Sequence, residues 1–365
     1  MNRPLIAVAM SGGVDSSVAA ALLARSGERL VGFSMRLAEQ VPGEPDRHGR
    51  CCTPDDCLDA RRVAFLLDFP HRVLDMAEEF RRHVLEPFAE AYAAGRTPSP
   101  CIGCNTHIKF GALLDRAREA GADLVATGHY AALEHDPTSG RTLLKRGRDR
   151  DKDQSYFLFD LSEEQRRRAR FPLGGLTKDE VRALAREMEL PVASKAESMD
   201  LCFISAEEDY RGFLARRGAL PGGEPGEIVD VSGRVLGRHA GIGGFTVGQR
   251  RGLGLAAGRP LFVVRIEPGT RRVVVGDGGD LSSDSCEIGN VRWVPFDRPS
   301  GPIRGTVKIR STHEGVGATV TDHGDGGATV RFDEPQRAVA PGQAAVLYDG
   351  DLVLGGGWIR AAAAS

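Results

Sequence analysis

The residues best suited to chemistry in this sequence start near the N-terminus, where a serine- and glycine-rich run joins an apolar segment to a helical one. The run reads SGGVDSS over residues 11–17 and follows the apolar residues 5–9. Gly12 and Gly13 lack Cβ atoms, so the backbone can approach an anion there, and free N–H groups at the positive end of a helix can hold it. A Walker A loop would need Gly-Lys-Ser/Thr and a Rossmann loop a third glycine, and the run contains neither. The pattern therefore predicts a phosphate site of another kind.

Two separated groups of cysteines are the second candidate for chemistry. Cys101 and Cys104 form a Cys-x-x-Cys pair just before a helix expected to start near residue 109. Thiols at a helix N-terminus generally form thiolates more readily, and the thiolate is both the nucleophile and the metal ligand. Spacing alone leaves catalytic, metal-binding and structural roles open for this pair. Cys202 ends a polar, serine-rich stretch, which can carry a thiol to an active site but also fits a buried core cysteine.

Alternating strands and helices are expected to position the loop. Apolar runs at residues 5–9, 30–35 and 124–127 indicate strands, and helical spacing is found at residues 16–26, 56–67 and 109–119. Such alternation is typical of an α/β fold with a parallel sheet and crossover helices. Thr177 and Glu180 have the spacing of a capping box that opens a further helix. The Pro/Gly-rich residues 40–50 are expected to form a loop.

The composition of the sequence changes near residue 206, where glycine and proline become frequent and short segments of alternating apolar and polar residues begin. Strands are expected at residues 262–266, 273–275, 305–310, 328–332 and 344–348. A chain of 365 residues also exceeds the roughly 250–300 residues that one core supports. We therefore expect a nucleotide-binding catalytic domain with a parallel sheet over residues 1–205, a small β-rich central domain over 206–280 and a C-terminal β-barrel over 281–365.

Composition excludes several classes of protein. Apolar residues make up 41% and charged residues 27% of the chain, as in ordinary globular proteins. No window reaches the ~18 apolar residues of a membrane helix, and the N-terminus lacks a signal-peptide pattern, so we predict a cytoplasmic protein. Seven cysteines at uneven spacing argue against a disulfide framework. We expect the remaining thiols to be structural or incidental; these are Cys51, Cys52, Cys57 and Cys286.

One region is basic although the formal net charge is only -2. Residues 141–170 contain ten Lys or Arg against six acids, a local excess of +4. Such a stretch is compatible with nucleic-acid binding and also with a solvated helix face and loop.

Several motifs together resemble known proteins. The run at residues 11–17 strongly resembles the pyrophosphate loop of the adenine-nucleotide α-hydrolases, which cleave ATP between the α and β phosphates. Over nearly its whole length the chain resembles the bacterial tRNA-specific 2-thiouridylases, the MnmA or TrmU family. The motifs that carry this second resemblance are Cys104-Asn105 with Ile108-Lys109-Phe110, Gly128-His129-Tyr130, Lys152-Asp153-Gln154-Ser155-Tyr156, and residues 200–203 and 245–253.

The resemblance implies an activity. It implies ATP-dependent 2-thiolation of the wobble uridine in the tRNA anticodon stem-loop, with ATP and Mg²⁺ as cofactors and AMP and pyrophosphate as products. The uracil O2 is adenylated, and sulfur delivered by a cysteine desulfurase relay replaces it. Cys104 matches the family's nucleophile and Cys202 its persulfide-carrying cysteine.

The resemblance also assigns binding residues. Those implied for ATP are Ala9, Met10, Ser11, Gly12, Gly13, Val14, Asp15, Ser16, Met35 (against the adenine) and Gly128, with Asp15 also counted as catalytic. Those implied for tRNA are Ser99, Pro100, Cys101, His129, Lys152, Asp153, Gln154, Arg310, Ser311 and Gln343. Ser99, Pro100 and Cys101 lie in the segment that holds the target base, which must be splayed from its loop to reach the nucleotide.

Three positions depart from the family pattern. Ser99 and Cys101 stand where one branch has Asn and Asp, and Ser311 stands where the family has an aromatic residue, so a stacking contact with RNA is missing there. With Cys101 present, Cys101, Cys104 and Cys202 could hold a [4Fe–4S] cluster with one iron open to sulfide. Persulfide and cluster mechanisms both stay open at this point.

Two other classes of function compete with sulfur transfer. An amidating synthetase acting on a small metabolite would also use a pyrophosphate loop but needs no paired thiols. A nucleic-acid or metal-binding module without turnover would use the basic stretch and the thiols but leaves residues 11–17 unexplained.

Overall fold

The computed structural model describes residues 3–37, 53–197, 201–204, 209–216, 224–256 and 258–364. Contacts divide the chain into two compact units. The first contains Met1–Val84, Cys101–Asp209 and Asp351–Val353, and the second contains Leu85–Pro100, Tyr210–Gly350 and Leu354–Ser365. The loop predicted at residues 40–50 lies outside the described residues. The domain boundaries at residues 205 and 280 stay a prediction.

The first unit is built on a parallel sheet of five strands in the order β3-β2-β1-β4-β7. The strands are β1 (Leu5–Ala9), β2 (Arg29–Arg36), β3 (His71–Asp75), β4 (Leu124–Ala126) and β7 (Ala169–Arg170). In the centre, Val8 of β1 lies opposite Gly32 of β2 and Ala126 of β4. A parallel sheet buries its central strands on both faces, which explains the continuous apolar sequence of β1. The predicted α/β fold is confirmed.

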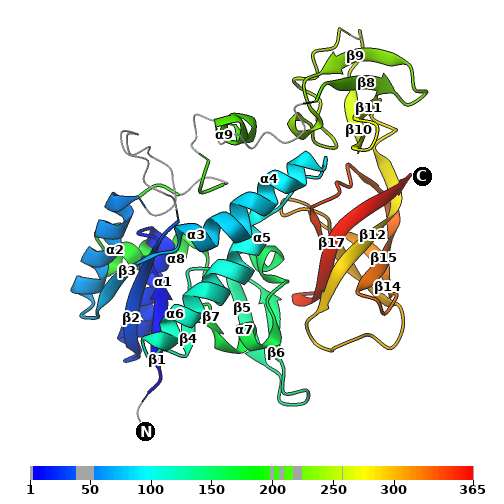
Figure 1. The fold of residues 1–365 in the computed structure, drawn as a ribbon. Coiled ribbons are helices and arrows are strands. Elements are labelled where there is room, and N and C mark those ends of the chain that lie inside the picture. Colours follow the sequence, from blue (N-terminus) through cyan, green and yellow to red (C-terminus); the bar gives the residue numbers. More distant parts are fainter. Residues whose placement is uncertain are drawn as a thin grey trace. The chain divides into compact units, whose positions relative to one another are not determined.

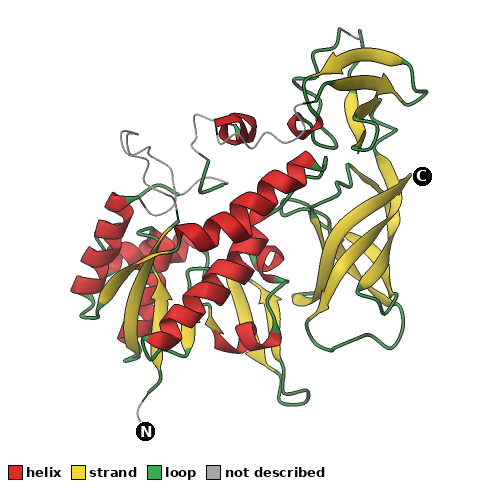
Figure 2. Ribbon diagram, in the orientation of Figure 1, coloured by secondary structure: helices red, strands yellow, loops and turns green. Residues whose placement is uncertain are grey.

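Helices cover the sheet (Figures 1 and 2). They are α1 (Val14–Arg25), α2 (Pro54–Leu66), α3 (Ala77–Phe80), α6 (Leu113–Glu119), α7 (Glu163–Arg168) and α8 (Lys178–Glu187). Ile6 and Val8 of β1 form one core with the alanine-rich α1 and with apolar residues of α2 and α8. Capping boxes open α2 at Thr53, α7 at Ser162 and α8 at Thr177. The box predicted at Thr177 is thus confirmed.

The helix that carries the Cys-x-x-Cys pair starts earlier than the sequence pattern indicates. It runs from α5 (Pro100–Gly103) through the π-helical segment η2 (Cys104–Ala112) into α6. The predicted start near residue 109 is therefore wrong. Pro100 explains the difference, because proline suits the first helical position, where its missing N–H is not needed. Both thiols lie inside the first turns of the helix.

Smaller elements complete the first unit. A hairpin of β5 (Ala131–His135) and β6 (Thr142–Arg146) follows β4. Lys145 of β6 lies opposite Leu352 in an antiparallel strand pairing. The π-helical segment η1 (Arg81–Leu85) follows α3, and a short 3-10 helix, η3 (Ser155–Leu158), precedes α7.

The second unit contains a mixed four-stranded sheet, an antiparallel barrel and short helices. A four-stranded sheet has the order β10-β11-β8-β9, from β8 (Gly226–Asp230), β9 (Val235–His239), β10 (Phe262–Glu267) and β11 (Arg272–Gly276). Only β8 and β11 are parallel neighbours in it. The helices are α4 (Glu86–Ala93), α9 (Tyr210–Arg216) and the 3-10 turn η4 (Ile242–Gly244).

A closed barrel forms the C-terminal part of this unit. Its strands are β12 (Ser282–Trp293), β13 (Ile303–Lys308), β14 (Val316–Asp322), β15 (Gly327–Arg337), β16 (Ala344–Asp349) and β17 (Leu352–Ala364). They follow one another in the order β12-β15-β14-β13-β16-β17, and the pairing of β12 with β17 closes the ring. Closure removes the exposed strand edges, and it confirms the predicted barrel. No helix within the described ranges is long and apolar enough to cross a membrane.

Candidate active site

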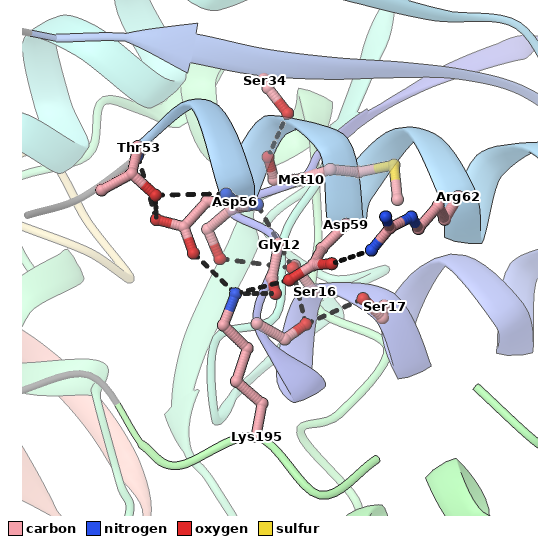
Figure 3. Close-up of polar contacts among 12 residues, drawn as sticks. Met10, Gly12, Ser16, Ser17, Ser34, Thr53, Asp56, Asp59, Arg62 and Lys195 are labelled. Carbon is pink, nitrogen blue, oxygen red and sulfur yellow. Dashed lines mark hydrogen bonds and ion pairs between the residues drawn. The ribbon is translucent and has the colours of Figure 1, made fainter. Parts of the chain in front are cut away.

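The loop between β1 and α1 has the geometry of an anion-binding turn (Figure 3). Gly12 has a φ of +71°, and a Cβ at this position would lie 2.2 Å from the carbonyl oxygen of Asp56. The Oγ of Ser16 accepts a hydrogen bond from the Ser11 N–H and donates to the Gly13 carbonyl, both at 3.2 Å. Gly13 caps α1 without a side-chain hydrogen bond. The first N–H groups of α1 are therefore left without a side-chain cap, and an anion can bind them.

Asp15, in the first turn of α1, is held by two partners from other elements. Both of its carboxylate oxygens accept from the Lys178 ammonium, at 2.7 and 2.8 Å, and Oδ1 accepts from the Tyr130 hydroxyl at 2.8 Å. Burial, and secondly the charge of Asp15, raise the pKa of Tyr130, so its hydroxyl stays protonated and donates. Lys178 was not singled out in the sequence as a site residue. Its position at the start of the capped helix α8 was the only signal.

Gly128 lies against this loop. A Cβ at Gly128 would be 2.8 Å from the backbone carbon of Asp15 and 2.8 Å from the Ser16 nitrogen. Only glycine lets the residues after β4 approach the loop this closely. Gly128 therefore lies against Asp15 and Ser16, and its role at the nucleotide stays a prediction.

The remaining residues expected at the nucleotide lie near the carboxyl ends of neighbouring parallel strands. Ala9, Met10 and Val14 are buried around the loop, and Met35 is buried near the end of β2. The Met10 N–H donates to the Phe33 carbonyl at 2.8 Å, which fixes the start of the loop beside β2. Open α/β sheets bind ligands beyond the carboxyl ends of their strands, and these residues lie at that edge.

The three candidate thiols differ in burial. Cys104 is buried, whereas Cys101 and Cys202 are half-buried. Phe203, next to Cys202, packs edge-on against Phe80 of α3 with ring centroids 5.8 Å apart. The helix α3 also packs against η2, which begins at Cys104. Phe203, the neighbour of Cys202 in the sequence, therefore contacts a helix that packs on the segment of Cys104.

Of the remaining cysteines, the structure describes Cys57 and Cys286. Cys286 is buried in β12, and burial raises the pKa of its thiol to about 12, so it stays a thiol. Cys57 is half-buried in α2, and Cys51 and Cys52 lie outside the described residues. Among the residues with described positions, no group of three or more His, Cys, Asp or Glu side chains is placed to hold a metal ion.

His129 is buried in polar and aromatic contacts. Its Nδ1 lies 2.6 Å from the Thr127 hydroxyl and its Nε2 lies 3.4 Å from the Lys109 ammonium. The ring also packs edge-on against Phe171. Burial, and secondly the charge of Lys109, hold the pKa of His129 well below its usual value. The imidazole is therefore neutral and acts as a hydrogen-bonding group.

The three residues 152–154 have different surroundings. Asp153 accepts from the N–H groups of Gly147 and Ser155, and Gln154 exchanges hydrogen bonds with the backbone of Tyr130. Lys152 instead pairs with Glu197 at 2.9 Å and keeps a side chain that is 39% exposed. Lys152 thus differs from Asp153 and Gln154 in being held by an ion pair.

The basic stretch at residues 141–170 is largely paired. Arg166 is fully buried, donates to the Thr142 carbonyl at 2.8 Å and pairs with Glu163 at 2.9 Å. Arg148 pairs with Glu180 at the surface. Acids outside the stretch therefore offset part of its charge excess, and at least one of its arginines belongs to the core.

In the second unit, Gln343 reaches the segment before the Cys-x-x-Cys pair. Its side-chain amide donates to the carbonyls of Thr97 and Pro98, at 3.0 and 3.2 Å. The segment continues into the buried Ser99 and the half-buried Pro100. Arg310 is exposed and Ser311 is half-buried. Gln343 is thus brought to the two residues that precede Ser99 and Pro100, although 246 positions separate Gln343 from Thr97.

The fold and this loop define a class of protein. A parallel sheet whose first strand leads through Ser-Gly-Gly-x-Asp-Ser into a helix is the nucleotide-binding domain of the pyrophosphate-loop enzymes. Family models match the chain in order: a tRNA methyl transferase HUP domain at residues 5–206, a tRNA methyl transferase PRC-barrel domain at 212–277 and an aminomethyltransferase beta-barrel domain at 283–359.

Full-length relatives narrow the class further. The tRNA-specific 2-thiouridylase MnmA of Acidobacterium capsulatum is 48% identical over 97% of this chain and 98% of its own length. That of Geobacter metallireducens is 49% identical over 99% of this chain and 98% of its own. The chain belongs to the tRNA-specific 2-thiouridylase family. A solved structure, the predicted tRNA methyltransferase subunit from Methanocaldococcus jannaschii, is 20% identical over 60% of this chain and 90% of its own, with a TM-score of 0.33.

Proposed function

We propose that this protein replaces O2 of the wobble uridine of tRNA by sulfur in an ATP-dependent reaction. The observation that carries the proposal is that a phosphate-binding loop and the thiols Cys104 and Cys202 belong to one compact unit. Family membership supports tRNA as the substrate. ATP and tRNA are both available in the cytoplasm, where we propose that the protein acts.

The loop at residues 11–16 fits the phosphates of ATP. Uncapped N–H groups of α1 offer hydrogen bonds to a phosphate, and Gly12 and Gly13 keep side chains out of its way. ATP with Mg²⁺ supplies an adenylyl group that converts the uracil O2 into a good leaving group. Lys178 and Tyr130 hold the Asp15 carboxylate at the start of α1. We propose that Met35 lines the adenine pocket and that Gly128 allows the close approach described above.

Sulfur transfer uses the two thiols in turn. Cys202 carries a persulfide delivered by a cysteine desulfurase relay, and its terminal sulfur attacks C2 as the C2–O2 bond breaks and AMP leaves. The Cys104 thiolate then attacks the Cys202 sulfur, so that the S–S bond to the base breaks and its electron pair forms the C2 thiocarbonyl. The products are 2-thiouridine, AMP, pyrophosphate and a Cys104–Cys202 disulfide, which an external thiol reductant must reduce. Two steps through a covalent adduct replace one difficult substitution.

The sulfur carrier could instead be a cluster on Cys101, Cys104 and Cys202. A [4Fe–4S] cluster would need all three thiolates, each on an iron of its own. We propose the persulfide, because it needs only Cys104 and Cys202, the two thiols that match the family's sulfur-transfer pair. Iron and sulfide analysis of anaerobically purified protein tests this choice, and stoichiometric iron and sulfide would refute it.

The target base must leave its stack to reach the site. We propose that Ser99, Pro100 and Cys101 hold the splayed base and that Lys152, His129, Asp153, Gln154, Arg310, Ser311 and Gln343 position the surrounding RNA. The hydrogen bonds from Gln343 to Thr97 and Pro98 support a role in shaping the base-holding segment.

The test compares Cys104→Ala with Cys286→Ala, which changes a buried cysteine in the barrel. Purified protein is given tRNA, ATP, Mg²⁺ and a persulfide donor, and 2-thiouridine is measured by nucleoside mass spectrometry beside pyrophosphate release. We expect Cys104→Ala to release pyrophosphate without forming 2-thiouridine, and Cys286→Ala to behave as the wild type. Full thiolation by Cys104→Ala would refute the proposed role of this thiol.

A further inference from the structure

Lys195 joins the segment before Cys202 to the phosphate loop. Its ammonium donates to the Gly12 carbonyl at 3.1 Å, to Asp56 Oδ1 at 2.6 Å and to Asp59 Oδ2 at 2.9 Å (Figure 3). A lysine ammonium has three N–H donors, and these three acceptors satisfy all of them. Burial alone would lower the pKa of Lys195, but hydrogen bonds to Asp56 and Asp59 outweigh it and raise the pKa, so the cation persists.

Glu197 attaches the same segment to the other side of the loop. It pairs with Lys152 at 2.9 Å, with Lys178 at 3.5 Å and with Arg182 at 3.6 Å. Lys178 is the residue that holds both oxygens of Asp15. Arg182, one turn further along α8, also donates to the Lys195 carbonyl at 3.5 Å.

Two anchors separated only by Ala196 therefore fix this segment on the loop, one at Gly12 and one through Lys178 at Asp15. Cys202 follows Glu197 by five residues. Five residues of extended chain span at most about 18 Å, so Cys202 stays within that distance of Glu197, which the anchors fix at the loop. A tether this short gives a tethered group an effective concentration in the millimolar range or above.

We propose that Lys195 and Glu197 are positioning residues that hold Cys202 beside the nucleotide loop, so that its sulfur is in place when the base is activated. In this role neither side chain contacts the reacting atoms. The inference rests on the proposed function because it assigns the sulfur-carrying role to Cys202. It differs from that function in predicting an effect on Cys202 that is measurable without turnover.

The test uses Lys195→Met, with Arg62→Met as the matched control. Arg62 binds Asp59 at 3.2 Å from the exposed side, so its loss removes a cation from the same carboxylate but leaves the Gly12 contact intact. The first readout is the alkylation rate of Cys202 by iodoacetamide in the full chain, followed by peptide mass spectrometry. We expect a rise of about fivefold in Lys195→Met and none in Arg62→Met, because the anchor opposes local opening.

The second readout is coupling, the amount of 2-thiouridine formed per pyrophosphate released. Misplacement of a reacting group typically costs 10- to 100-fold, so we expect coupling in Lys195→Met to fall about tenfold, and coupling in Arg62→Met to match the wild type. Binding of α,β-methylene ATP should change by less than about threefold, because the uncapped N–H groups of α1 remain.

Glu197→Gln breaks the second anchor and should raise Cys202 alkylation in the same direction, which keeps the proposal testable if Lys195→Met does not fold. Unchanged alkylation and coupling in a folded variant of either anchor would overturn the proposal. If the wild type forms no 2-thiouridine, the proposed function fails, and the alkylation comparison still decides whether the anchors hold Cys202.

Discussion

Gly12→Ala and Gly13→Ala change adjacent residues, and the structure predicts losses of stability of very different size. Gly12 has a φ of +71°, and an added Cβ would lie 2.2 Å from the backbone oxygen of Asp56. The left-handed backbone costs alanine about 1–2 kcal/mol, and overpacking against backbone costs about 1–3 kcal/mol. The sum of about 2–5 kcal/mol corresponds to a fall in Tm of about 4–20 °C for a domain of this size.

Gly13→Ala is the control for this prediction. Gly13 has a φ of -92°, which alanine adopts freely, and the nearest atom to an added Cβ is the Ser11 Oγ at 3.5 Å. The loss should stay below about 1 kcal/mol, the difference between glycine and alanine at a helix N-cap. A methyl group there would nonetheless take up space that a phosphate needs to approach the backbone, so ATP affinity should fall.

The assay is thermal unfolding followed by circular dichroism, combined with calorimetric titration of α,β-methylene ATP. The expected result is a large fall in Tm for Gly12→Ala only, and weak nucleotide binding for both variants. Equal melting temperatures for the two variants would refute the steric reasoning. Normal nucleotide binding by Gly13→Ala would refute the placement of phosphate on this turn.

Four further predictions concern single side chains. Arg166→Met should lower the free energy of unfolding by about 2–4 kcal/mol in urea titrations, because the buried carbonyls and Glu163 lose the guanidinium that binds them. Lys152→Ala should leave stability nearly unchanged and reduce the salt dependence of tRNA binding by about one ion. Because the pKa of His129 is lowered in the folded protein, its imidazole takes up a proton only in the unfolded chain as the pH falls below about 6.5, and stability therefore falls with pH. His129→Gln should remove up to about 2 kcal/mol of the stability loss between pH 7 and pH 5. An unchanged pH dependence of stability in this variant would contradict the prediction. Cys286, with its pKa raised to about 12, should resist iodoacetamide at pH 8 until the protein unfolds, and its early modification in peptide maps would disprove its burial.

The parts of the fold predicted correctly from sequence are those set by local patterns. The apolar run of β1, the glycines of the loop and the Thr177 capping box each act within a few residues, so their spacing is visible in the sequence. The helix start was predicted too late because the apolar periodicity becomes clear only near residue 109, whereas Pro100 already opens the helix.

Contacts of high sequence separation could not be predicted in this way. Lys178 lies 163 positions from Asp15, and Lys195 lies 183 positions from Gly12. Nothing in the local sequence of a lysine determines which distant carboxylate or carbonyl it will meet. Arg166 shows a second limit of sequence reasoning. The charge count assigns it to a basic stretch compatible with a solvated surface, whereas its side chain is buried in the core. The family resemblance supplied the roles of Cys104 and Cys202, which spacing alone left open.

We propose that ATP bound at residues 11–16 activates uracil O2, which sulfur then replaces. An oxygen label follows this step: tRNA that carries ¹⁸O at O2 of the target uridine is incubated with the protein, ATP, Mg²⁺ and a persulfide donor. If O2 is adenylated, the C2–O2 bond breaks during sulfur attack and the label leaves on AMP, so mass spectrometry should find one labelled AMP for each 2-thiouridine formed. Formation of 2-thiouridine with unlabelled AMP would contradict adenylation of O2.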